Sequence, residues 1–192
     1  MSRLVSGLRE PELLNCYDNL NKVNEAVEDL VRDLTDTQLQ WKPEPEVWSI
    51  SQCLEHLLVT ARADLPHIRR GIDDGRARKV FGQGPFRYGL LSRLLILAMG
   101  APARVKVKAP RVYRPVGNKG SDELLREFFL AQQEMLDCIR AADGLHLAKV
   151  KTCLPGQKYI RLSLGQEFRL VIVHEQRHVW QAQQIKIHPR FP

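Results

Sequence analysis

Residues 163–185 read SLGQEFRLVIVHEQRHVWQAQQI, and this stretch decides the fold. Ser163 and Gln166 have the spacing of a capping box, which predicts a long helix from about Gln166 to Ile185. Polar and apolar side chains share one face of this helix at steps of three and four: Val171, His174, His178, Gln181 and Ile185. The apolar residues at both ends of that face predict that it points into the protein interior.

Three further segments have helical periodicity. Apolar residues recur at steps of three and four from Leu13 to Leu34. A capping box at Ser49 and Gln52 predicts a second helix that ends near Ile72, and Ser121 with Asp122 can cap a third helix. The polar connector 35–46 allows one short turn around position 39. The sequence therefore predicts an all-α fold, a four-helix bundle.

Length and composition favour one soluble domain over residues 1–192. The chain has 192 residues, of which 44% are hydrophobic and 27% charged, and this excludes a disordered protein. The longest apolar run, 94–103, is about half the length of a membrane span. No secretory signal stands at the N-terminus, and the four cysteines form no C-x-x-C pair, so we expect reduced thiols and a cytoplasmic location.

A basic insertion separates the second and third predicted helices. Residues 73–120 are rich in glycine and proline, and only 88–99 has a helical pattern. Positions 69–119 contain 13 Lys and Arg but two Asp, a local charge of +11 in a chain of net charge +7. Such a segment suits contact with an anionic ligand, a membrane surface or the acidic face of a partner subunit.

Histidines carry the most specific chemical signal. His174 and His178 stand four residues apart, so both rings leave one helix face and can reach one metal ion. With Glu175 they form the H-E-x-x-H pattern of zinc proteases, but no acidic residue follows Glu175 to serve as the third ligand. His56, on the apolar face of the second helix, is the expected third ligand from upstream.

Other readings of these residues stay open at this point. Two histidines four apart also occur by chance, and a lone histidine on an apolar face is often a hydrogen-bonded core residue. His67, His146 and His188 are assigned to the surface or to loops. Four residues near the histidines in the sequence are candidates to line the pocket or to contact the metal ligands: Cys53, Thr60, Glu175 and Gln181. For Glu175, a contact behind the metal or a surface ion pair is favoured over a general base, and for Cys53 a buried thiol is favoured.

Two motifs resemble those of the DinB-like superfamily. Residues 48–50, Trp-Ser-Ile, lead into Leu-Glu-His-Leu at 54–57, and Leu164-Gly165 leads into residues 174–178 and Gln181. The resemblance implies a four-helix bundle that holds zinc or nickel at the positions of His56, His174 and His178. Characterised members include S-transferases and isomerases that use bacillithiol, mycothiol or glutathione. The insertion 73–120 is longer than the link usual in this superfamily.

The expected function is therefore a metal-dependent transferase that uses a low-molecular-weight thiol on a small-molecule substrate, and the resemblance also implies a homodimer. One alternative is a metal-dependent hydrolase of a small molecule. The other is a non-catalytic metal-binding bundle with a basic surface for a membrane or nucleic acid. Nucleic acid is the less favoured partner, because Tyr113 is the one aromatic residue among the basic positions 104–114.

Overall fold

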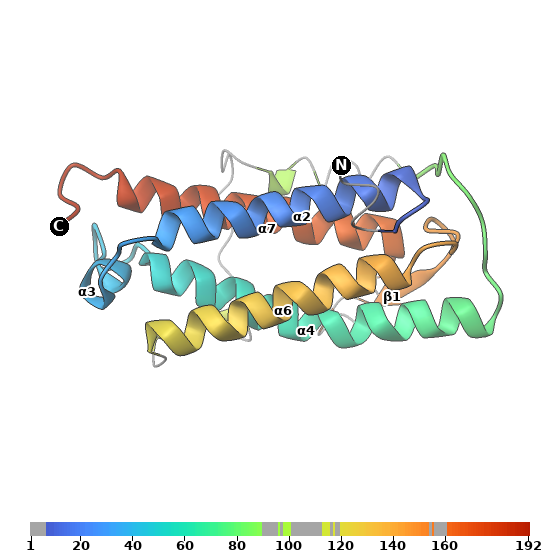
Figure 1. Ribbon diagram of the computed structural model, residues 1–192, viewed down its shortest axis with the longest axis horizontal. Coiled ribbons are helices and arrows are strands. Elements are labelled where there is room, and N and C mark those ends of the chain that lie inside the picture. Colours follow the sequence, from blue (N-terminus) through green and yellow to red (C-terminus); the bar gives the residue numbers. More distant parts are fainter. Residues whose placement is uncertain are drawn as a thin grey trace.

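The computed structural model describes residues 7–89, 96, 98–100, 113–115, 117, 120–153, 155 and 161–192. Four long helices form a bundle: α2 (Pro11–Val31), α4 (Ile50–Ala77), α6 (Ser121–Ala141) and α7 (Leu164–Lys186). A short helix α3 (Asp36–Gln40) follows α2, and the strands β1 (Lys151–Cys153) and β2 (Arg161–Ser163) pair antiparallel before α7. The predicted all-α bundle is confirmed (Figure 1).

The helix starts are set by local sequence. The side chain of Ser49 accepts a hydrogen bond from the Gln52 amide at 3.1 Å, and the Gln52 side chain accepts one from the Ser49 amide at 3.2 Å. At α7 the Gln166 side-chain oxygen accepts from the Ser163 amide at 3.0 Å. The predicted cap of the third helix was wrong, because α6 begins at Ser121 and its N-cap residue is a glycine without a side-chain bond.

Helices α4 and α6 run parallel. Arg62 pairs with Glu127 at 3.0 Å, and Arg69 pairs with Glu134, so the partner number rises by seven in both helices. Because the helices are parallel, the chain between them must return along the bundle, and the 28 residues of α4 span about 42 Å. A long connection at this place is thus required by the topology.

Helices α2 and α7 also run parallel. Arg169 pairs with Glu12 near their starts at 3.2 Å, and Lys186 donates to the Leu30 carbonyl near their ends at 2.7 Å. The beginning of α2 lies beside the end of α6, where Asp143 accepts hydrogen bonds from the residues that precede α2. The bundle is therefore an up, down, down, up arrangement, with α2 beside α7 and α4 beside α6 (Figure 1).

The connection between α4 and α6 differs in part from its prediction. Helix α4 continues to Ala77, so residues 73–77 belong to its last turns and not to the insertion. Within the predicted helix 88–99, residues 88 and 89 are not helical, 96, 98 and 99 are, and the others lie outside the described residues. Most of the basic stretch 104–114 also lies outside them. No helix in the described part of the chain is both long and apolar enough to cross a membrane.

Candidate metal centre

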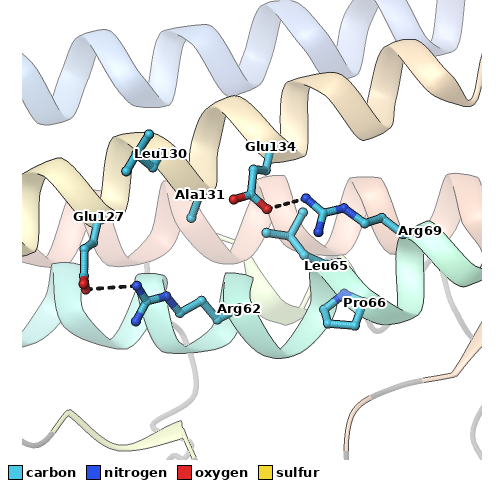
Figure 2. Close-up of a pocket in the computed structure, with 8 residues that line it drawn as sticks. All are labelled: Arg62, Leu65, Pro66, Arg69, Glu127, Leu130, Ala131 and Glu134. Carbon is cyan, nitrogen blue, oxygen red and sulfur yellow. Dashed lines mark hydrogen bonds and ion pairs between the residues drawn. The ribbon is translucent and has the colours of Figure 1, made fainter.

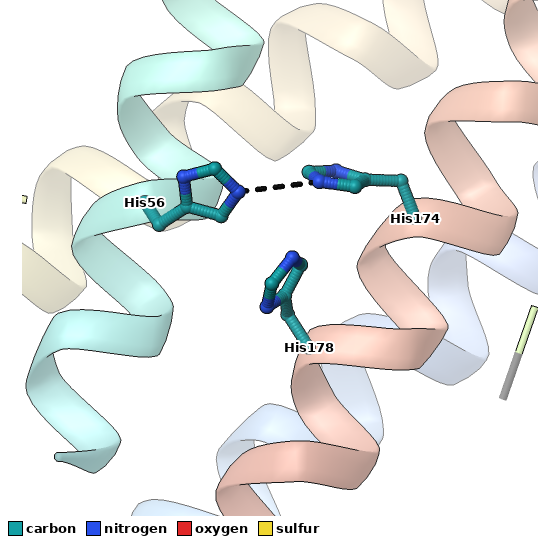
Figure 3. A group of neighbouring side chains, drawn as sticks. All are labelled: His56, His174 and His178. Carbon is teal, nitrogen blue, oxygen red and sulfur yellow. Dashed lines mark hydrogen bonds between the residues drawn. The ribbon is translucent and has the colours of Figure 1, made fainter. Parts of the chain in front are cut away.

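Three histidines from two helices meet in the bundle. Helix α4 contributes His56, which is 4% exposed, and α7 contributes His174 and His178 from successive turns. One ring nitrogen of each lies within 4.8 Å of the other two, and the Nε2 atoms of His56 and His174 are 3.2 Å apart. Figure 3 shows the three rings pointing toward one another. The sequence analysis predicted that these three histidines lie close together, and in the structure they do.

Two of the rings are oriented by hydrogen bonds behind them. His56 Nδ1 lies 2.6 Å from the main-chain oxygen of Tyr113, and His178 Nδ1 lies 3.2 Å from the side-chain oxygen of Gln181. Both partners are acceptors, so each Nδ1 carries the proton and each Nε2 presents its lone pair to the centre of the cluster. Gln181, a predicted pocket residue, thus orients a histidine from the next turn of α7.

The cluster fits a transition-metal ion. Two nitrogens bound to one tetrahedral zinc ion at about 2.0–2.1 Å lie about 3.3 Å apart, close to the 3.2 Å between His56 and His174. Burial lowers the pKa of His56, that of His174 to about 3 and that of His178 to about 2. For His174 and His178 the charges of the neighbouring histidines, and then of Arg177, are smaller causes. Neutral imidazoles are the form that binds metal. Three nitrogen donors of this kind suit zinc or nickel.

An indole packs against the cluster. The ring of Trp48 stacks on His178 at 5.7 Å between centroids and lies 4.9 Å from His56. Trp48 stands directly before the capping box of α4, so the local geometry that starts the helix also places the indole. The sequence analysis did not include Trp48 or Tyr113 in the site. Trp48 belongs to the Trp-Ser-Ile motif, which was a usable signal, whereas Tyr113 acts here through its main chain.

Cys53 and Thr60 do not reach the cluster with their polar atoms. Cys53 is fully buried one turn before His56, and burial raises the pKa of its thiol to about 12. The hydroxyl of Thr60 donates to the main-chain oxygen of His56 at 2.8 Å, a bond within α4. Within the described ranges, the cluster that could hold a metal ion consists of the three histidines alone, with no cysteine or carboxylate in it.

The surface ion pair expected as one role of Glu175 in the H-E-x-x-H pattern is wrong. Glu175 is 2% exposed, so it is not in a surface ion pair, and its carboxylate accepts a hydrogen bond of 2.9 Å from Gln132 on α6. Burial raises its pKa to about 7. Because this carboxylate is bound toward α6 while His174 faces α4, Glu175 does not have the position of a zinc-protease base.

The other histidines lie apart from the cluster. His67 is half-buried on α4, His146 follows α6 and contacts Phe86, and His188 follows α7 and contacts Trp41. The loop assignment agrees with the positions of His146 and His188, whereas His67 lies within α4, because that helix continues to Ala77.

Comparison with protein families matches residues 19–182 to the DinB superfamily. The chain belongs to the DinB superfamily. The match includes all of α4 and residues 164–182 of α7, and therefore all three histidines of the cluster. No curated protein and no solved structure matches the chain. Membership in the DinB superfamily accounts for the bundle and for the order of the two motifs.

Proposed function

We propose that this DinB-superfamily protein binds one divalent metal ion, zinc or nickel, through the Nε2 atoms of His56, His174 and His178. The observation that carries this proposal is the convergence of three neutral imidazoles from α4 and α7 on one point. The hydrogen bonds to Tyr113 and Gln181 support it, because they leave the inward nitrogens of His56 and His178 free of protons.

We propose further that the protein is a transferase that uses a low-molecular-weight thiol on a small-molecule substrate. A metal held by three protein ligands keeps at least one position open and lowers the pKa of a thiol or water bound there. We infer that the nucleophile comes from outside the chain, because Cys53, the thiol one turn before His56, is fully buried and burial raises its pKa to about 12. A soluble thiol satisfies this requirement.

The same site would serve a hydrolase less well. Water attack is assisted by a general base, and Glu175, the acidic residue within the histidine motif, is bound to Gln132. A thiol, in contrast, has a pKa of about 8.5, far below the value of about 15.7 for water, so it becomes its nucleophilic anion more readily without such a base. This difference favours the transferase over the alternative of a small-molecule hydrolase.

A groove between α4 and α6 supports the homodimer as a proposal (Figure 2). Leu130, 58% exposed, lines this groove from α6, where it stands between Glu127 and Glu134 in the sequence. A second copy related by a two-fold axis along the helices would set Arg62 and Arg69 of each copy against the glutamate row of the other. Sedimentation of Leu130→Glu beside the wild type tests this: an unchanged mass contradicts the interface.

The four cysteines support the proposal of a cytoplasmic location. All four are free thiols in the structure, as a reducing compartment would keep them.

Elemental analysis tests the metal site. The wild type and His56→Ala, His174→Ala and His178→Ala are dialysed, reloaded with zinc or nickel and analysed, with His67→Ala on α4 as the control. We expect about one metal ion per chain in the wild type and control, and loss or sharp weakening in the three variants. Folded wild-type protein without metal would overturn the proposal.

Thiol screening tests the reaction. The zinc-loaded and nickel-loaded proteins are offered glutathione, bacillithiol or mycothiol with small electrophiles, and thioether formation is followed. Turnover that needs both thiol and metal supports the transferase. Turnover of an ester or amide without thiol would favour the hydrolase, and full metal content with neither activity would favour a non-catalytic bundle.

A further inference from the structure

The segment before α6 is fastened along α4 at the histidine cluster. We call its described residues, 113–115 and 117, the strap. The amide of Gly117 donates to the Glu55 carboxylate at 2.8 Å, and the main-chain oxygen of Tyr113 accepts from His56 Nδ1 at 2.6 Å. Two successive residues of α4 therefore hold two points of the strap.

Glu55 is an unusual residue for the first half of a helix that faces a protein core. It is 4% exposed, and a buried carboxylate is costly unless it is hydrogen-bonded. The bond from the Gly117 amide satisfies part of this need with a main-chain donor, which every residue except proline would supply at that position. Glu55 thus ties a buried charge to the backbone position of the strap.

A third contact fixes the other end of the strap. The hydroxyl of Tyr113 donates to the main-chain oxygen of Pro155, in the connection between β1 and β2, at 3.0 Å. Burial, and then the charge of Asp64, raise the pKa of Tyr113, so the phenol keeps its proton and stays a donor. Asp64 lies two turns beyond His56 on α4, which places the Tyr113 ring along the same helix.

We propose that Glu55 is a positioning residue of the metal site: by holding Gly117 it keeps the Tyr113 carbonyl on His56 Nδ1 and so fixes the tautomer of His56. The inference rests on the proposed function, since the tautomer matters because Nε2 is the metal-binding atom. A neutral histidine in water favours the proton on Nε2, the atom that must be free for the metal. The strap reverses this preference before any metal arrives.

Nitrogen NMR of the metal-free protein tests the tautomer directly. Ring ¹⁵N shifts of His56 are measured in the wild type, Glu55→Ala and Glu55→Gln, with Asp73→Ala as an exposed acidic control on α4. We expect the Nδ1–H form in the wild type, the control and Glu55→Gln, whose amide oxygen can still accept from Gly117. Glu55→Ala should shift His56 toward the Nε2–H form.

Zinc affinity of the same variants gives the second measurement. Loss of a group that orients a metal ligand weakens binding by about 10- to 100-fold. We therefore expect Glu55→Ala to bind zinc at least about 10-fold more weakly than the wild type, and Glu55→Gln to bind it with wild-type affinity. If Glu55→Ala fails to fold, Tyr113→Phe takes its place as the test variant. It removes the hydrogen bond to Pro155 and should shift the tautomer of His56 in the same direction.

The two proposals fail in different ways. If Glu55→Ala and Tyr113→Phe leave both the tautomer and the zinc affinity at wild-type values, the positioning role is wrong although the metal site stands. If the wild type binds no zinc or nickel, the proposed function is wrong, and the ¹⁵N shifts still decide whether Glu55 sets the tautomer.

Discussion

The side-chain amide of Gln132 on α6 donates a hydrogen bond of 2.9 Å to the carboxylate of Glu175 on α7. Both residues are 2% exposed. The next residue toward the N-terminus, His174, turns instead to His56 on α4. One step along a helix, about 100°, thus separates a residue of the histidine cluster from a residue that joins α7 to α6.

Replacing Glu175 by glutamine should leave metal binding intact. The Gln side chain keeps an oxygen that can accept from Gln132, and the histidine cluster is untouched. We expect zinc content and any thiol-transfer activity to stay close to wild type, measured by elemental analysis and initial rates. A folded, fully loaded Glu175→Gln variant with about 100-fold lower kcat would instead show a general base. Glu175→Ala should lower the unfolding free energy by about 1–3 kcal/mol, because it leaves the buried amide of Gln132 without its acceptor.

Raising the pH should destabilise the fold through Asp64. Burial, and then the charges of Glu167 and Glu175, raise its pKa to about 8, and burial raises the pKa of Glu167 to about 7. The native protein therefore holds protons that the unfolded chain has already lost, so the unfolding free energy falls as the pH rises toward 8. Between pH 7 and 8.5 Asp64 alone accounts for about 1 kcal/mol.

Denaturant unfolding at several pH values measures this effect. Asp64→Asn should flatten the pH dependence between 7 and 8.5, whereas Asp73→Asn, an exposed acid on the same helix, should keep the wild-type slope. Burial, and then the charge of Asp64, raise the pKa of Tyr113, so this phenol stays protonated throughout the range. Equal slopes in the wild type and Asp64→Asn would contradict a protonated Asp64.

Local signals in the sequence located the four long helices and singled out the three histidines, but they missed the cap of α6 and the end of α4. The capping boxes at Ser49 and Ser163 and the 3.6-residue periodicity are properties of neighbouring residues, so they predicted the starts of α4 and α7. The directions of the helices depend on pairs such as Arg62 with Glu127, which are 65 positions apart, and no local pattern encodes them. The contact of Tyr113 with His56 uses a carbonyl that every residue has, so its side chain gave no signal.

Gly165 should be hard to replace. A Cβ atom there would overlap the hydroxyl of Tyr88 and lie 2.9 Å from the Glu12 carboxylate, to which Tyr88 donates a hydrogen bond of 2.6 Å. We expect Gly165→Ala to lower the unfolding free energy by about 1–3 kcal/mol, because the hydrogen bond between Tyr88 and Glu12 restrains both side chains from moving out of the way. Thermal and urea unfolding measure the loss.

A double-mutant cycle separates this overlap from a general effect of alanine. Tyr88→Phe removes the crowded hydroxyl, so Gly165→Ala should cost less in the Tyr88→Phe background than in the wild type. Gly120→Ala is the control, since nothing lies within 4 Å of a Cβ atom at that position and its φ is −63°. Because Gly120 is the N-cap of α6, where alanine is less favourable than glycine, we expect a cost of about 0.5–1 kcal/mol that is equal in both backgrounds. Equal costs of Gly165→Ala in both backgrounds would contradict the overlap with Tyr88.

Trp48 should report metal binding by fluorescence. Its indole stacks on His178 and contacts His56, so an ion with unpaired electrons held at the Nε2 atoms would lie next to it. We expect Co²⁺ or Ni²⁺ to quench the tryptophan emission, and Trp48→Phe to remove the larger part of that quenching while metal content stays the same. Trp180→Phe is the matched control. Trp180 is on α7, two residues after His178, and among the described residues its ring is not in contact with the rings of the cluster. If most of the quenching survives in Trp48→Phe, the bound ion does not lie next to Trp48. It would then not be held by His56 and His178, whose rings contact this indole.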